Sequence, residues 1–340
     1  MNTLITITGS GMVTAVGNDA ASSCAAIHCA IDNFRESQFM DNAGEPITTA
    51  ACELDEPCSG ETRLVKMAAA ALAECLASNS AIDCKHTPLI LCLPERSRQD
   101  YPISDDAAFF LAIQEELGLG FSDKSRLLAH GHVSAAVALL NARQMLANNQ
   151  SVKHVLIASA DSLLSTATLQ HFEDNDRLLT SEHSDGILPG EAAAAIVVER
   201  ARGNRGAMLV HGIGFAVEPA PILSGKPTQA QGLTQAIKAA LEEAQLPMQE
   251  MAYRITDLSG EHYYFREAAL ALSRTLRVLR DEFDILHPAD CVGETGTALG
   301  FIILGYQLDL IRTHPPDFPQ LIAHFSNDDG RRAAIVLGMN

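Results

Sequence analysis

The sequence predicts an α/β fold made of two similar halves, with β-sheets covered by helices on both sides. Short aliphatic or β-branched runs alternate with longer Ala- and Leu-rich runs along the chain, as in folds that alternate strands and helices. Several runs, such as Pro88 to Leu93 and Val155 to Ala160, are apolar throughout, which is typical of parallel strands buried on both faces. An apolar strand leading into Gly-x-Gly occurs twice, in ITITGSGMVTAVG at residues 5 to 17 and in MLVHGIGFAVEPA at 208 to 220.

The first half is predicted to open with a strand over Leu4 to Thr8, which Gly9 and Gly11 end. Asn18-Asp19 then caps a helix over Ala20 to Ala30, because such side chains accept hydrogen bonds from the first backbone N–H groups of a helix. Residues 36 to 60 are polar and rich in turn formers, so we expect loops there. The elements that follow are helix Thr62 to Ser78, strand Pro88 to Leu93, helices Phe109 to Leu117 and Ser134 to Ala147, and strand Val155 to Ala160.

A second round of alternation follows. Its predicted elements are strands Ala192 to Glu199 and Ala207 to Phe215, helix Leu233 to Gln245, strand Tyr253 to Leu258, helices Phe265 to Phe283 and Gly296 to Arg312, and strands Gln320 to Phe325 and Ala333 to Leu337. The halves are placed at residues 1–203 and 204–340, with a boundary near Arg202 to Gly206. Because no low-complexity linker separates them, we expect one compact, pseudo-symmetric unit.

Composition limits the classes of partner. The 340 residues include 24 basic and 42 acidic ones, a formal charge of −18, which repels phosphate backbones and anionic membranes, so no nucleic-acid or membrane partner is expected. No targeting segment or membrane-spanning run is recognised, which favours a cytoplasmic protein. The eight cysteines lack Cys-x-x-Cys pairing and a His at zinc-ligand spacing, so we expect buried thiols and neither a metal nor a cofactor.

Four segments resemble β-ketoacyl-acyl-carrier-protein synthases when taken in their order and spacing. They are ITITGSGMVTAVGN at residues 5 to 18, SDGILPGEAAAAIVVE at 184 to 199, GKPTQAQGLTQAIKA at 225 to 239 and VGETGTALG at 292 to 300. The second is similar to that family's Asp-Gly-Phe-x-x-Gly-Glu-Gly-Ala strand, and the fourth to its Gly-His-x-x-Gly-Ala-Ala-Gly turn. The resemblance implies a thiolase-like fold, a five-layer αβαβα duplication, in a chain that is shorter than typical members.

The resemblance also implies where the family's catalytic site falls. Condensing enzymes use a Cys at a helix N-terminus and two His residues that bind the thioester carbonyl. The segment GHVSAAVALLNARQML at residues 131 to 146 resembles the turn and helix that carry the Cys, but it has no thiol. The Cys position falls at His132, with Gly131 and Ser134 as alternatives. The first His position falls at Ser259, with His262 close behind, and the second at Glu294.

These substitutions predict that decarboxylative condensation fails. An imidazole at His132 cannot hold an acyl group as a stable thioester, and Ser259 is a shorter donor without a useful pKa. Glu294 brings negative charge to a place that should stabilise an oxyanion, and we expect its carboxylate to pair with His132 or His262. The family's Phe-Gly-Gly gate is replaced by Asn-Asp-Asp-Gly at residues 327 to 330.

Some of these residues also fit other chemistry. Ser134, His262 and Glu294 are the residue types of a Ser/His/acid hydrolase, with His132 as a further base, but no Gly-x-Ser-x-Gly elbow is present. The residues His130-Gly131-His132, with Glu261 or Glu294, could form a metal site, but a packing role in a buried turn is favoured. Asp328-Asp329 could bind a cation, but a solvated acidic loop is favoured. Arg266, Arg274, Arg277 and Arg280 on one predicted helix form either a docking face for an acidic carrier protein or a solvated face.

Two classes of function remain. The favoured one is a non-condensing homologue that binds, either beside an active synthase, as chain-length-factor subunits do, or as an adaptor for an effector protein. The alternative is an acyltransferase, hydrolase or decarboxylase that acts on acyl thioesters without Cys, so enzymatic activity is left open. We expect a homodimer or a heterodimer with a synthase-like subunit, with Val155 to Ala160 as the pairing strand at a sheet edge, and an acyl carrier protein as a further partner.

Overall fold

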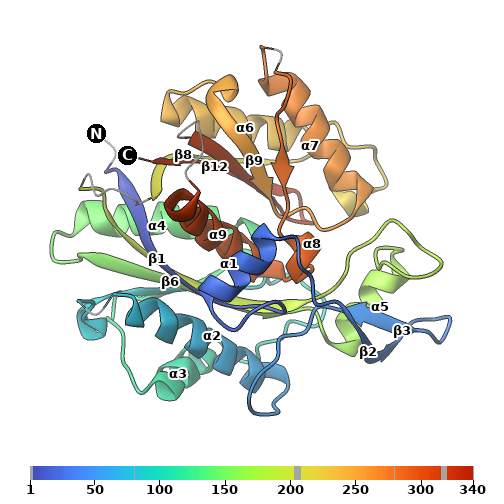
Figure 1. Cartoon of the computed structure of the whole chain (residues 1–340), viewed down its shortest axis with the longest axis horizontal. Helices are drawn as coiled ribbons and strands as arrows, with labels where there is room; N and C mark the ends of the chain where they lie inside the picture. The colour runs from blue at the N-terminus through green and yellow to red at the C-terminus, as the bar shows by residue number, and fades with distance from the viewer. Residues whose placement is uncertain (1–2, 80, 203–207, 279, 315–319, 340) are drawn as a thin grey trace.

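A computed structural model describes residues 3–79, 81–202, 208–278, 280–314 and 320–339 (Figure 1). The first half contains β1 (Ile5–Val13), α1 (Ala20–His28), β2 (Arg35–Met40), β3 (Pro46–Thr49), α2 (Gly60–Ala77), β4 (Leu89–Leu93), α3 (Asp106–Leu117), β5 (Arg126–Ala129), α4 (Ser134–Asn148), β6 (His154–Ser162), α5 (Thr166–Asp174) and β7 (Glu191–Arg200). The second contains β8 (Met208–Val217), α6 (Gln231–Ala244), β9 (Met251–Thr256), α7 (His262–Thr275), β10 (Ile285–Leu286), α8 (Ala289–Val292), α9 (Leu299–Thr313), β11 (Gln320–Ser326) and β12 (Arg331–Met339). No helix among these is both long and apolar enough to cross a membrane.

The two halves repeat one strand order. In the described residues, the main sheet runs β10-β9-β11-β12-β8-β1-β7-β6-β4-β5, so the order β5-β4-β6-β7-β1 is matched by β10-β9-β11-β12-β8. Within each set, the first three strands are parallel to one another, and each of the last two pairs antiparallel with the strand before it. The sets meet where β1 pairs with β8, from Ile5 opposite Val210 to Ile7 opposite Met208. The predicted boundary falls largely on residues 203–207, outside the described residues.

Figure 1 shows the predicted five-layer αβαβα arrangement. Helices α2 and α3 form one outer layer and α6 and α7 the other, while α4 and α9 lie between the two sets of strands. The central helix α9 contacts β1, β7, β8 and β9, and its residues from Leu299 to Leu308 are buried. The thiolase-like fold class is therefore confirmed, with mixed rather than wholly parallel strands. Strands covered by helices on both faces lose polar alternation in either orientation, so the sequence does not distinguish the two.

The Gly-x-Gly repeat marks the closest approach of a helix to each set of strands. A Cβ atom at Gly11 would lie 2.1 Å from the carbonyl oxygen of Ala71 on α2. A Cβ atom at Gly214 would lie 2.0 Å from the carbonyl oxygen of Ala236 on α6. These glycines are required because a side chain there would push the outer helix off the sheet.

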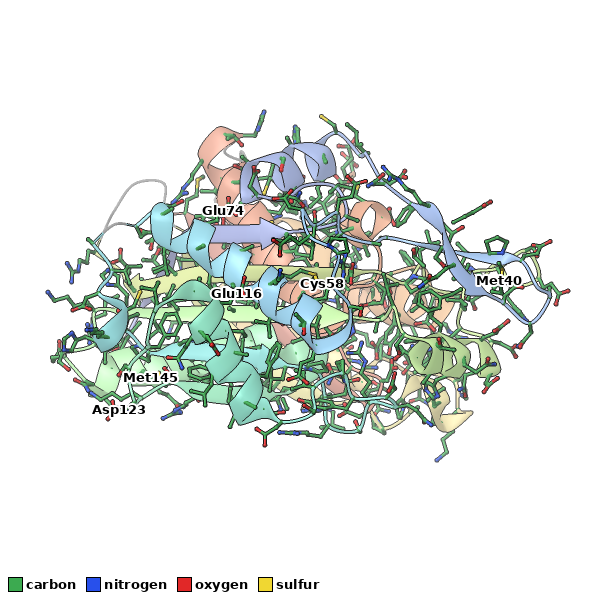
Figure 2. The ribbon with its side chains drawn as sticks, turned by 90° about the horizontal axis from the view of Figure 1, so that it is seen from below. Met40, Cys58, Glu74, Glu116, Asp123 and Met145 are labelled. Atoms are coloured by element: carbon green, nitrogen blue, oxygen red, sulfur yellow. The ribbon has the colours of Figure 1, made fainter. Side chains whose placement is uncertain are left out.

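Four predictions of local structure are corrected. Residues 36 to 60 contain the β2–β3 hairpin, which carries Met40 and projects from the body of the molecule (Figures 1 and 2). Helix α7 ends at Thr275 instead of Phe283. The elements β5, α5, β10 and α8 were not predicted. The run Val155 to Ala160 belongs to β6, which lies between β4 and β7, so it is not the edge strand. The edge strand of that half is β5. The prediction failed because strand order depends on contacts that local sequence does not encode.

Candidate functional site

A cavity of about 280 Å³ is the candidate site. Its walls come from loops that follow the carboxyl ends of β4, β5, β6, β9 and β11. Helix α5 and the loop after it, the start of α7, the turn Ile222–Ser224 and the loop after α8 complete them. Open α/β sheets place their ligand sites at this end of the strands. Both halves of the chain contribute, so the cavity depends on the whole fold.

His132 occupies the turn between β5 and α4. Its Nδ1 lies 3.3 Å from Asp257 Oδ2 and its Nε2 lies 3.4 Å from Glu294 Oε1. Burial disfavours the charged ring, but Glu294, Asp257 and Glu95 together raise the pKa of His132 to about 10. The ring is therefore an imidazolium at neutral pH, held by carboxylates on both of its nitrogen atoms.

The preceding Gly131 allows this placement. Its φ of +61° is the left-handed conformation that glycine adopts without strain. A Cβ atom at this position would lie 2.4 Å from Glu95 Oε2. The absence of a side chain at Gly131 thus lets the Glu95 carboxylate pack beside the turn that presents His132.

Glu294 connects two of the predicted site positions. Its Oε1 accepts a hydrogen bond from Gly296 N at 2.8 Å, and its carboxylate also accepts one from the Ser259 side chain. Burial raises the pKa of Glu294, while His132 and Ser259 act in the opposite direction. The structure thus brings His132, Ser259 and Glu294 into one hydrogen-bonded and ionic cluster, and the expected pairing of Glu294 with His132 is present.

Arg98, which lines the cavity, forms an ion pair with Asp161 that was not predicted from the sequence. Asp161, at the end of β6, is fully buried and accepts a hydrogen bond from Arg98 Nη1 at 2.5 Å. Its other oxygen accepts one from Thr297 N at 2.8 Å, in the 3₁₀ turn Gly296–Ala298 that leads into α9. A carboxylate at a helix start is stabilised by the unpaired N–H groups there. The sequence did carry a signal for this residue, because Asp161 follows six apolar or small residues of a buried strand.

Arg177 ties three loops together at the cavity wall. It donates to both carboxylate oxygens of Glu261, at 2.6 and 2.8 Å, and to both of Asp328, at 2.7 and 3.0 Å. Burial opposes ionisation of Asp328, but Arg177 and the Tyr264 hydroxyl hold its pKa down to about 2. The expectation that Asp328 belongs to a merely solvated loop is therefore wrong.

The neighbouring Asn327 fixes the same loop to the turn that carries His132. Its Oδ1 accepts a hydrogen bond from Val133 N at 3.1 Å, and its Nδ2 donates to His130 O at 2.8 Å. One backbone N–H at the start of α4 is consequently taken by an amide oxygen from within the chain.

The structure does not bring the other candidate residues into the cavity. Ser134 is fully buried at the start of α4, and its Oγ has no hydrogen-bond partner in the described residues. The His262 side chain is 79% exposed and pairs with Asp185 at 3.4 Å. Ser134, His262 and Glu294 therefore do not form a hydrolase triad. His130 Nδ1 lies 2.7 Å from Arg331 Nη1, and no group of three or more His, Cys, Asp or Glu side chains in the described residues is arranged to hold a metal ion.

No thiol reaches the cavity. All eight cysteines lie within the described residues, and none lines its walls. Burial raises the pKa of Cys75 and that of Cys24 to about 12, so these thiols remain protonated at neutral pH. A thiolate nucleophile is absent from this site.

The predicted row of arginines is also not present as a helix face. Because α7 ends at Thr275, Arg277 and Arg280 lie beyond the helix. Arg274 donates a hydrogen bond to the carbonyl of Gln229, and Arg280 donates one to the carbonyl of Met251. The last three arginines therefore do not share a helix face, although Arg274 and Arg277 line the same surface pocket.

The chain is similar to known proteins in structure. No protein-family model matches the chain, and no curated protein matches it in sequence. A chain from the complex of the ketosynthase ApeO with its chain length factor ApeC from Xenorhabdus doucetiae has a TM-score of 0.80 and 14% identity, over 99% of this chain and 98% of that one. The ishigamide ketosynthase/chain length factor gives 0.77 and 17%, over the whole of both chains. A β-ketoacyl synthase from Burkholderia phymatum gives 0.74 and 15%, over 99% and 100%. The chain has the fold of ketosynthases over its described length.

Proposed function

We propose that this chain is a non-condensing ketosynthase-like subunit that pairs with an active ketosynthase, in the manner of a chain length factor. The observation that carries this proposal is the charged cluster of His132, Asp257 and Glu294. By the sequence resemblance, His132, Ser259 and Glu294 stand where a condensing enzyme has its Cys and two His residues. In this cluster the imidazolium of His132 lies between two carboxylates, and no thiol is present.

The chemistry of each group opposes condensation. A protonated imidazole has no free electron pair, so His132 cannot attack a thioester or accept a proton at neutral pH. Ser259 already donates to Glu294, which weakens it as a donor to a substrate carbonyl. The negative Glu294 also repels the carboxylate of a malonyl group. Transfer or hydrolysis of an acyl group meets the same obstacle, since Ser134 is buried away from the cavity.

An exposed sheet edge supports pairing with another subunit. β5 is the last strand of its half, and its outer edge has no partner among the described residues. Leu127 on this strand is 36% exposed. On β8, Phe215 is 40% exposed and Val217 is 63% exposed. Arg331, the sheet partner of Val217, contacts His130, which lies directly after β5. An apolar edge strand of this kind is a template for pairing with another chain.

The proposed occupant of this edge is a ketosynthase subunit. The similar folds include ketosynthases solved together with chain length factors. The charge of −18 works against self-association, because two copies of the chain repel each other. A heterodimer with a less acidic ketosynthase is therefore favoured over a homodimer.

The pairing is tested by coexpressing the chain with each ketosynthase subunit encoded in the same genome and measuring mass by light scattering after size-exclusion chromatography. We expect one subunit to give the summed mass of a heterodimer. Leu127→Glu should reduce the recovered heterodimer at least tenfold, while Val278→Glu, an exposed apolar residue that follows α7, should leave it unchanged. A stable homodimer, or a monomer with every ketosynthase subunit, would contradict the proposal.

The chemical half of the proposal is tested by intact-protein mass spectrometry after incubation with acyl- and malonyl-thioesters. We expect no acyl-enzyme and no condensation product from the wild type. His132→Cys should also fail, because Asp257, Glu294 and Glu95 would surround the new thiol with negative charge and raise its pKa. Condensation by the wild type at rates near those of ordinary synthases would show that the family positions are wrongly assigned.

A further inference from the structure

The first end of β5 carries two exposed cationic residues. Lys124 lies just before the strand, and Arg126 is its first residue. Arg126 donates a hydrogen bond to Asn141 Oδ1 on α4 at 2.7 Å, which places its side chain on the α4 side of the sheet. Neither cation forms an ion pair within the described part of the chain. A strand that pairs with β5 must therefore accommodate two positive charges at this end.

A histidine that is bonded to a cation stands at the other end of β5. His130 directly follows the strand, and its Nδ1 lies 2.7 Å from Arg331 Nη1. A guanidinium only donates, so Nδ1 is the acceptor and the neutral ring carries its hydrogen on Nε2. Burial and the charge of Arg331 lower the pKa of His130, whereas Asp329 opposes them. His130 therefore has no acceptor left for a second cationic side chain.

Pairing of β5 with a second copy of the chain would bring these two ends together. A closed dimer repeats its contacts about a two-fold axis, so the two β5 strands would be antiparallel. Leu128 packs against the core cluster that contains α4, and Ala129 against the cluster that contains α2 and α3. When the helical layers of the two copies are in line, residues that face the same layer lie opposite each other. The symmetric registers with the most paired residues are then centred on Leu127 or on Leu128.

Both registers place a cation opposite His130. With the axis at Leu127, Lys124 lies opposite His130 of the second copy. With the axis at Leu128, Arg126 takes that place. Directly opposite residues have Cβ atoms about 4.5–5.5 Å apart. Lysine and arginine only donate hydrogen bonds, and the Nε2–H of His130, which has no partner in the described residues, also donates. Donors therefore meet donors, and the two-fold axis repeats this unfavourable contact.

Two nearby carboxylates do not correct the mismatch. Asp329 binds the Nε and Nη2 side of Arg331, at 2.7 and 2.6 Å, so its charge lies away from the Nη1 atom that contacts the imidazole. Asp123, labelled in Figure 2, would lie opposite Gly131 or Val133 of the second copy, and neither carries a cationic group. Self-pairing at β5 is therefore opposed at both ends of the strand.

Three donors thus define what can pair with β5: Lys124, Arg126 and His130, termed the edge donors. We propose that the edge donors exclude a second copy of the chain and select a partner strand whose apolar centre is flanked on both sides by carboxylates. The inference rests on the proposed pairing at β5 and names the chemistry that the ketosynthase subunit presents there. The flanking carboxylates accept hydrogen bonds from the edge donors, and the apolar centre packs against the exposed Leu127. A partner of different sequence can meet these requirements, whereas a second copy cannot.

The proposal is tested first on the chain alone, by light scattering over a series of concentrations. Lys124→Glu combined with Arg126→Glu puts a carboxylate opposite His130 in both symmetric registers. Each reversal lowers the formal charge by two, from −18 to −22 in total, so the overall repulsion between copies grows. The overall charge therefore predicts weaker self-association, whereas the edge donors predict a dimer whose affinity rises at least about tenfold. The sign of the change decides between the two.

Two controls locate the effect at β5. Lys238→Glu with Arg277→Glu reverses two exposed cations of the second half, makes the same change of net charge, and should not increase self-association. Adding Leu127→Glu to the first double variant should abolish the new dimer, since Leu127 lies within the pairing strand. The single variants Lys124→Glu and Arg126→Glu identify the register, because the residue opposite His130 should carry the gain.

The second test uses the ketosynthase subunit that coexpression identifies. Lys124→Glu with Arg126→Glu should lower the recovered heterodimer at least about tenfold, and changing the carboxylates beside the partner's pairing strand to lysine should restore it. The proposal is wrong if the double variant self-associates no more than its charge-matched control, or if the heterodimer is insensitive to the reversal. Either result leaves a heterodimer intact, which distinguishes it from a failure of the proposed pairing, in which no ketosynthase subunit binds.

Discussion

Replacing Arg177 with Met should remove a large part of the stability of the fold. Arg177 is 6% exposed and donates four hydrogen bonds of 2.6 to 3.0 Å to Glu261 and Asp328. Met fills a similar volume without charge, so Glu261, which is 5% exposed, would lose the two hydrogen bonds that Arg177 donates to its carboxylate. Leaving one buried member of an ion pair uncompensated costs about 3–5 kcal/mol.

Asp328 contributes less to this loss than Glu261 does. Its side chain is 42% exposed, and it keeps the hydrogen bond from the Tyr264 hydroxyl. Water can therefore replace much of what Arg177 supplied to Asp328. The loss should also shrink as the pH is lowered, because burial already raises the pKa of Glu261 and the variant would protonate that carboxyl more readily.

The assay is urea unfolding followed by circular dichroism, with the free energy of unfolding compared at pH 7.5 and pH 5. Arg35→Met is the matched control, since Arg35 and Glu53 form an ion pair in which both side chains are 67% exposed, and its cost should stay below about 1 kcal/mol. Glu261→Gln added to Arg177→Met should recover part of the loss by removing the unpaired charge. A loss of less than about 1 kcal/mol in Arg177→Met, equal to that of the control, would refute this reasoning.

The remaining predictions concern the turn and the cluster around it. NMR titration of the ring carbons should find His132 protonated at pH 8 and His324, whose pKa burial lowers to about 3, neutral. Since the folded pKa of His132 is raised, its contribution to stability is fully present below about pH 6.5 and is lost at up to about 1.4 kcal/mol per pH unit as the pH rises to 10. A free ring titrating near pH 6.5 would contradict the ion cluster. Gly131→Ala should cost at least about 1–3 kcal/mol in urea unfolding, because its φ of +61° strains any side chain and its Cβ would meet Glu95. Asp328 should contribute stability above about pH 4 that disappears as the pH falls through 2, and Asp328→Asn should abolish that part of the acid transition.

Local pattern was sufficient for the features that depend on neighbouring residues. The cap at Asp19 is formed as expected, with its side chain accepting a hydrogen bond from Ser22 N. The Gly-x-Gly repeat predicted the duplication because Gly11 and Gly214 meet the same steric requirement under α2 and α6. A requirement of this kind leaves a mark at each site, so it is readable without the rest of the fold.

Local pattern did not predict the features that depend on distant residues, and the pairing of His132 with Glu294 was expected only from the family resemblance. Arg98 and Asp161 are 63 residues apart, and Arg177 and Asp328 are 151 residues apart. The residues around each of these side chains do not indicate its partner. The ion pairs form only because the fold brings the strand ends together. The identity of β5 as the edge strand has the same origin, since its four residues carry a weaker strand pattern than those of β6.

The altered residues at the cavity are coupled by charge, which explains why they cannot be understood one at a time. The N-terminal end of α4 carries a partial positive charge that disfavours a cation next to it, yet the pKa of His132 is raised. The carboxylates of Asp257 and Glu294 therefore outweigh the helix. Without His132, Glu294 would be a buried charge with no cationic partner in the cluster, and without Glu294 the imidazolium would lose one of its two carboxylates. Either change alone costs stability, whereas the two together form a compensated cluster. The site is thus organised around ion pairs between its own residues, which suits a subunit that binds and does not suit one that must keep a nucleophile ready for an incoming thioester.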